Sequence, residues 1–135
     1  MGANQSPTMQ DAVDDLYRLA VLEKKRTSTK RLSRLAEVCL AGLEARGFAK
    51  AEAEVRIPGG GREKDWDVAW KWDSKFRLVI SLKSILKNLG GTVPNRLDDA
   101  MGETTNIQLY SPEIVTGYVM VFNKSEDLPD KAGDT

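Results

Sequence analysis

A lysine follows the most apolar strand-like run of this chain, and its position raises a question of chemistry. The run is FRLVISL, residues 76–82, and its apolar, β-branched composition is typical of a central β-strand. Lys83 comes directly after it. Burying an ammonium group is strongly unfavourable unless an anion lies beside it. We therefore expect an anionic partner for Lys83.

The expected partner is Asp67, in the aromatic segment DWDVAWKW at 65–72. A short turn at 73–75 makes this segment antiparallel to 76–82, which lets Asp67 approach Lys83. Ser81 and Lys83 share one face of their strand, because side chains alternate along a strand. Two other interpretations stay open: a purely structural ion pair between Asp67 and Lys83, and a Ser81–Lys83 nucleophilic dyad. The dyad is disfavoured, since no oxyanion-stabilising device is recognisable nearby.

The amino-acid composition excludes several classes of catalytic and metal site. The chain has 135 residues, no histidine and one cysteine, which excludes Ser-His-Asp and Cys-His devices and disfavours a zinc site. Its length predicts a single domain over 1–135, and no apolar run reaches the roughly 20 residues of a membrane span. Because no secretory signal is recognisable, we expect a cytoplasmic protein with no membrane partner.

Hydrophobic periodicity predicts three helices and four strands. Helices are expected at 9–25, 29–46 and 94–109, and strands at 51–57, 65–72, 76–82 and 114–122. PGGGREK (58–64) is typical of a hairpin tip, and 84–93 is expected to be a loop. Pro94 suits a first helical position, with Leu97, Met101 and Thr104 or Thr105 along one face of that helix. The first three strands then form an antiparallel meander, and the last helix lets the fourth strand run parallel to the third.

These residues and this order of elements resemble the PD-(D/E)xK nucleases, the restriction-endonuclease-like superfamily. The resemblance rests on an Asp in one strand, polar-x-Lys at the end of the next, and then a helix and a strand. More narrowly, SLKS followed by PNRLDDAMGETTN resembles a subset of type II restriction endonucleases. It implies an α/β fold with an αβββαβ core over about 30–122: a mixed central sheet flanked by helices, with an extra N-terminal helix. The N-terminus is expected to be loose and the C-terminal tail acidic.

The resemblance also implies a function, a Mg²⁺-dependent DNA endonuclease that also accepts Mn²⁺. Asp67 would bind the metal together with the backbone carbonyl of Leu82, and Lys83 would be the catalytic lysine. Ser81 stands where the family usually has its second acid. Either Glu37 or Glu103 then supplies that charge, or catalysis is lost; Glu37 lies off the apolar stripe of its helix, as an ordinary solvated glutamate would.

Basic and amide side chains are candidates for contacts with DNA. Lys30 and Arg34 belong to a basic segment, and Asn95 and Arg96 suit phosphate contact or helix capping at the expected helix start. Cutting both strands needs two active sites, so a homodimer is expected. The alternative function is a catalytically inactive nuclease-fold module that binds DNA or another protein.

Overall fold

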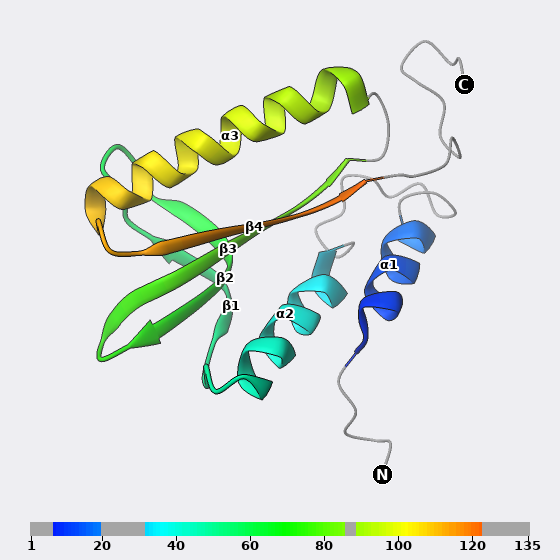
Figure 1. Cartoon of the computed structure of the whole chain (residues 1–135), viewed down its shortest axis with the longest axis horizontal. Coiled ribbons are helices and arrows are strands. Elements are labelled where there is room, and N and C mark those ends of the chain that lie inside the picture. Colours follow the sequence, from blue (N-terminus) through cyan, green and yellow to red (C-terminus); the bar gives the residue numbers. More distant parts are fainter. Residues whose placement is uncertain (1–6, 20–31, 86–88, 123–135) are drawn as a thin grey trace.

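A four-stranded mixed sheet with helices on both faces forms the fold (Figure 1). The computed structural model describes residues 7–19, 32–85 and 89–122. The elements are α1 (Met9–Tyr17), α2 (Ser33–Ala45), β1 (Glu52–Ile57), β2 (Lys64–Trp72), β3 (Lys75–Ile85), α3 (Leu89–Tyr110) and β4 (Val115–Phe122). The sheet order is β1-β2-β3-β4, antiparallel except for the parallel β3–β4 pair. The predicted α/β class, the order of elements and the parallel last strand are confirmed.

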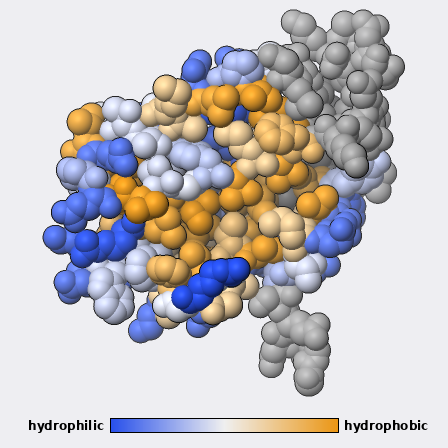
Figure 2. All heavy atoms as spheres, in the orientation of Figure 1, coloured by the Kyte–Doolittle hydropathy of each residue, from blue (hydrophilic) through white to orange (hydrophobic). Residues whose placement is uncertain are grey.

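The sheet has a hydrophobic cluster on each face. On one face Ile107 of α3 packs in a cluster with Ile57, Trp66, Ala69, Val79 and Ile114. On the other face Ala12 of α1 and Leu35 of α2 pack against Leu82 of β3. In Figure 2 apolar residues spread across the middle of the view, and hydrophilic residues gather toward the outline. The two faces of β3 therefore belong to different clusters, and Ser81 and Lys83 share the alternation of Val79 on the α3 side.

Local sequence explains where the N-terminal helices begin and end. Thr8 caps α1, accepting from the amide of Asp11 at 3.1 Å, while Asp11 accepts from the amide of Thr8 at 2.9 Å. Of the predicted helix 9–25, residues 20–25 lie outside the described residues, as do 29–31 of the second predicted helix. Gly47, with φ of 93°, follows the end of α2, as expected for a helix C-terminus. Within the described ranges, no helix is both long and apolar enough to cross a membrane.

The predicted loop at 84–93 is wrong. β3 continues to Ile85 and α3 begins at Leu89, so Pro94 lies inside the helix. Sequence reasoning placed Pro94 at the first helical position because its ring removes a helix hydrogen bond; here α3 tolerates that loss in its second turn. Lys83 is therefore two residues short of the strand end.

The side of α3 that meets the sheet is partly polar. Leu97 and Met101, on the predicted common face, are 50% and 69% exposed. Ile107 is fully buried, and the side chain of Glu103, one turn earlier, is only 12% exposed. The helix thus turns a carboxylate toward the sheet and leaves two apolar side chains in solvent.

Candidate active site

The strands β2 and β3 stop pairing at Asp67. Their ladder runs from Trp72↔Lys75 to Val68↔Ile80, although β2 extends back to Lys64 and β3 on to Ile85. Regular alternation would put residues 66 and 69 on opposite faces, yet both belong to the cluster under α3. The neighbouring strand is also irregular, since Glu54 has φ of 55°. Around Asp67 the side chains of β2 therefore do not alternate regularly between the two faces of the sheet.

Asp67 occupies the opening between the two strands. Its Oδ2 accepts a hydrogen bond from the amide of Leu82 at 2.7 Å, in place of a ladder bond. In a strand the N–H and C=O of one residue point to the same side, so the Leu82 carbonyl also faces this opening. The pKa of the Cys39 thiol on α2 is raised, first by burial and then by the charge of Asp67. The Asp67 carboxylate is thus within electrostatic range of α2.

The partner of Lys83 is Glu103, and the predicted ion pair with Asp67 is wrong. The Nζ of Lys83 lies 3.5 Å from Oε2 of Glu103, and the side chains are 14% and 12% exposed. Asp67 is turned toward the backbone of Leu82 instead, because β2 and β3 have already separated at this point. A carboxylate on α3, 20 positions along the sequence from Lys83, supplies the expected anion.

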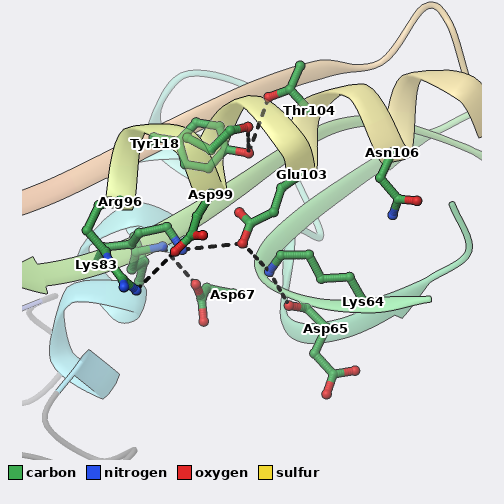
Figure 3. Close-up of polar contacts among 12 residues, drawn as sticks. Lys64, Asp65, Asp67, Lys83, Arg96, Asp99, Glu103, Thr104, Asn106 and Tyr118 are labelled. Atoms are coloured by element: carbon green, nitrogen blue, oxygen red, sulfur yellow. Dashed lines mark hydrogen bonds and ion pairs between the residues drawn. The ribbon is translucent and has the colours of Figure 1, made fainter. Parts of the chain in front are cut away.

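A second lysine shares the same carboxylate. Figure 3 shows Glu103 reaching from α3 between Lys83 and Lys64, whose Nζ lies 3.9 Å from Oε2. Lys64 also donates to the backbone oxygen of Asp65 at 3.0 Å and lies 4.6 Å from the ring centroid of Trp66. Burial lowers the pKa of Lys64 and the charge of Lys83 lowers it further, while Glu103 acts in the opposite direction. Sequence reasoning missed Lys64, and no motif marks it.

Two buried oxygens on this side of the sheet have no hydrogen-bond partner among the described residues. They are Oγ of Ser81, a residue only 1% exposed, and Oε1 of Glu103. Because the Ser81 hydroxyl donates to no base among the described residues, the geometry does not support the Ser81–Lys83 dyad. Both oxygens are buried, so a water or a cation would reach them only after neighbouring side chains moved.

Tyr118 closes the site on the β4 side, and sequence reasoning missed this residue too. It lies opposite Ser81 in the parallel register. Its hydroxyl donates to the carbonyl of Ala100 at 3.0 Å and lies 3.2 Å from Oγ1 of Thr104. Burial raises the pKa of Tyr118 to about 12; the hydrogen bond with Thr104 opposes this shift, and the charge of Glu103 adds to it. The phenol therefore stays neutral over the whole working range of pH and fixes α3 to β4.

Asn106 fixes the hairpin tip that precedes Lys64. Its Oδ1 accepts from the amides of Gly61 at 2.8 Å and Arg62 at 3.2 Å, and its Nδ2 donates to the carbonyl of Arg62 at 3.0 Å. The amide of Gly60 donates to the Asn106 carbonyl at 2.6 Å. The tip is thereby tied to α3, and this determines the position at which β2 starts.

Two other predicted residues, Glu37 and Arg34, are exposed on α2 and are not part of this cluster. A third, Lys30, lies outside the described residues. In the described part of the chain Glu37 makes no hydrogen bond or ion pair with Asp67 or Lys83, which leaves Glu103 as the acid beside Lys83. In the described ranges no three His, Cys, Asp or Glu side chains lie close enough together to hold a metal ion by themselves.

Asn95 and Arg96 lie within α3 rather than at its start, so neither caps the helix. Asn95 is exposed. Arg96 pairs with Asp99 at 3.1 Å, and its buried Nε has no hydrogen-bond partner. In Figure 3 the guanidinium of Arg96 lies on the Lys83 side of the cluster. Of the two, Arg96 is the residue the fold brings near the site.

Comparison of the chain with protein-family models, with curated proteins and with solved structures finds no match. Any functional assignment for this protein therefore depends on the chemistry of Asp67, Leu82, Lys83 and Glu103.

Proposed function

We propose that this protein is a restriction-endonuclease-like, Mg²⁺-dependent DNA endonuclease whose active site comprises Asp67, Lys83 and Glu103. One observation carries the proposal. Two carboxylates that are remote in sequence contact consecutive residues of β3. Asp67 accepts a hydrogen bond from the amide of Leu82, and Glu103 forms an ion pair with the ammonium of Lys83. Carboxylates beside a lysine at a gap in a sheet suit metal-assisted phosphodiester hydrolysis.

The oxygen atoms of this site fit a hard divalent cation. Mg²⁺ typically takes one or two protein carboxylates and completes its octahedron with water and substrate phosphate. Oδ1 of Asp67 makes no hydrogen bond within the described part of the chain, and Oε1 of Glu103 is buried and unpartnered. The Leu82 carbonyl and the Ser81 hydroxyl add neutral oxygens. A carboxylate on α3 thus compensates for a serine at the position of the second acid.

Each side chain has a defined role in hydrolysis. A metal bound here would lower the pKa of a bound water and stabilise charge on the phosphate. Asp67 and Glu103 provide negative charge to hold it, and the Leu82 amide fixes the orientation of Asp67. Lys83 places a positive charge where the phosphate gains negative charge. The water oxygen forms a bond to phosphorus and releases a proton to solvent, one P–O ester bond breaks, and the leaving oxygen takes a proton from solvent.

The proposal extends to partners. The substrate is DNA, with Arg96 beside the site and Arg34 on the opposite helix layer as candidates for backbone contact. One site cuts one strand, so a homodimer would supply the second cut.

A second candidate is a nuclease-fold module that binds DNA or protein without cutting. Ser81 favours it, because a buried hydroxyl is a much poorer ligand for Mg²⁺ than the expected acid. Affinity for a divalent metal separates the two candidates.

A calorimetric titration with Mn²⁺ tests the proposal. We expect the wild type to bind, and Asp67→Asn and Glu103→Gln each to weaken binding by roughly tenfold or more. Glu37→Gln, which removes an exposed carboxylate elsewhere on the fold, is the matched control and should bind as the wild type does. Mn²⁺ binding that is absent, or that is indifferent to both site variants, would support the non-catalytic module.

A further inference from the structure

Lys64 is a second lysine beside Glu103, in addition to the proposed catalytic lysine Lys83. Both Lys64 and Lys83 lie against the same oxygen of Glu103, at 3.9 Å and 3.5 Å. Their side chains are 15% and 14% exposed, so water screens the two ammonium groups only in part. Two ammonium groups therefore share one oxygen of Glu103, and Asp67 is a second negative charge within electrostatic range of Lys64.

Three features of the fold fix the position of the Lys64 ammonium. It donates to the carbonyl of Asp65 at 3.0 Å, lies over the Trp66 ring at 4.6 Å, and sits at the start of a strand tied to α3 by Asn106. A surface lysine normally loses much side-chain freedom when it binds an anion. Lys64 has already lost that freedom, so a bound anion would not have to order it.

The Lys64 side chain is only 15% exposed, and Lys83 lies against the same carboxylate oxygen of Glu103. A partly buried cation in such a place is stabilised by an additional anion. In a site that handles DNA, the anion at hand is a backbone phosphate, and a lysine binds phosphate as a point charge.

We propose that Lys64 is a phosphate-binding residue: it contacts a DNA backbone phosphate beside the one that Lys83 faces, while Glu103 pairs with both ammonium groups. This inference rests on the proposed nuclease function. It adds to that function a second lysine that binds substrate, at a position with no counterpart in the sequence motif.

The test is the salt dependence of DNA binding by the full chain, with Ca²⁺ in place of Mg²⁺ so that binding is measured without cleavage. A fluorescently labelled duplex is titrated at a series of NaCl concentrations, and the slope of log K against log[NaCl] is compared among variants. Each phosphate contact contributes roughly 0.9 to this slope for duplex DNA. We expect Lys64→Met and Lys64→Gln to reduce the slope by about one contact, and Lys64→Arg to restore it.

Lys75→Met is the matched control, because it removes the same charge from an exposed lysine at the opposite end of β3. Thermal melting of each variant identifies any that fail to fold, and two different neutral replacements guard against one of them doing so. A wild-type slope in both neutral variants, or an equal loss in Lys75→Met, would overturn the role of Lys64 while leaving the proposed function standing. Absence of DNA binding by the wild type would overturn both.

Discussion

Asp67 accepts a hydrogen bond from the amide of Leu82 at 2.7 Å, at the point where the ladder between β2 and β3 has ended. One oxygen of the carboxylate is thereby fixed to the backbone of the strand that carries Lys83. The other oxygen makes no hydrogen bond within the described ranges. A separated pair of strands thus presents a carboxylate and a carbonyl in one opening, which neither strand would do if the ladder continued.

The hydrogen bond between Asp67 and the amide of Leu82 should contribute to the free energy of unfolding of the metal-free protein. Asp67→Ala leaves the amide of Leu82, a residue only 5% exposed, without a partner, which should cost about 1–3 kcal/mol. Asp67→Asn keeps an acceptor oxygen and should cost less. Urea unfolding in the presence of a chelator measures both. Equal stability of the two variants would show that the Leu82 amide does not depend on this side chain.

Removing the charge of Glu103 should destabilise the metal-free chain, because Lys64 and Lys83 then face each other without their shared anion. The side chains of Glu103 and the two lysines are mostly but not fully buried. We therefore expect Glu103→Gln to lower the free energy of unfolding by about 2 kcal/mol at low salt. Added salt should reduce the loss by screening the repulsion between the lysines.

The control for that variant is Glu113→Gln. Glu113 is 77% exposed and pairs with Arg77 at 3.4 Å, so its removal should change stability by at most about 1 kcal/mol. Equal effects of the two substitutions in urea unfolding would contradict a special role for Glu103.

The two glycines Gly60 and Gly102 should respond to alanine in opposite ways. A Cβ at Gly60 would overlap the Cβ of Leu109 on α3, whereas one at Gly102 would meet no atom within 4 Å. Gly102→Ala should stabilise the chain by about 0.5–1 kcal/mol, since alanine restricts the unfolded chain more than glycine does. Gly60→Ala should destabilise it by detaching the hairpin tip. Thermal unfolding of both variants tests this, and a stabilising Gly60→Ala would contradict the packing of the tip on α3.

Alkaline pH should weaken the fold through Tyr118. In the folded chain its pKa is raised to about 12, from an ordinary value of 10.0 in the unfolded chain. Between these values the folded state keeps the proton while the unfolded state loses it, so the free energy of unfolding falls as pH rises. Tyr118→Phe should lack this part of the fall, and Tyr110→Phe, which changes an exposed tyrosine, should keep it. Urea unfolding from pH 9 to pH 11 compares them, and identical profiles would contradict the assignment.

The fold was largely predictable because its strands and helices follow hydrophobic periodicity. The four strands, the parallel pairing of the last one and the shared face of Ser81 and Lys83 all follow from alternation and connection length. The start of α3 could not be predicted in this way. Pro94 favours a first helical position, whereas the helix already begins at Leu89.

The candidate site was predictable only in part. Asp67 and Lys83 were recognisable from residue type, but their pairing was not, because it depends on where β2 and β3 separate and not on the sequence interval between them. Glu103 was one of two candidate acids, and only the orientation of α3 distinguishes it from Glu37. Lys64 has no motif, and its role depends on a contact across the fold.

Cleavage of supercoiled plasmid DNA with Mg²⁺ tests the central claim most directly. The wild type should nick or linearise the plasmid, and chelation of the metal should abolish the reaction. Asp67→Asn, Lys83→Met and Glu103→Gln should each lower the rate by roughly a hundredfold or more, whereas Glu37→Gln should cleave at the wild-type rate. Cleavage that persists in Asp67→Asn and Lys83→Met, or a wild type that never cuts, would contradict the assignment of this site.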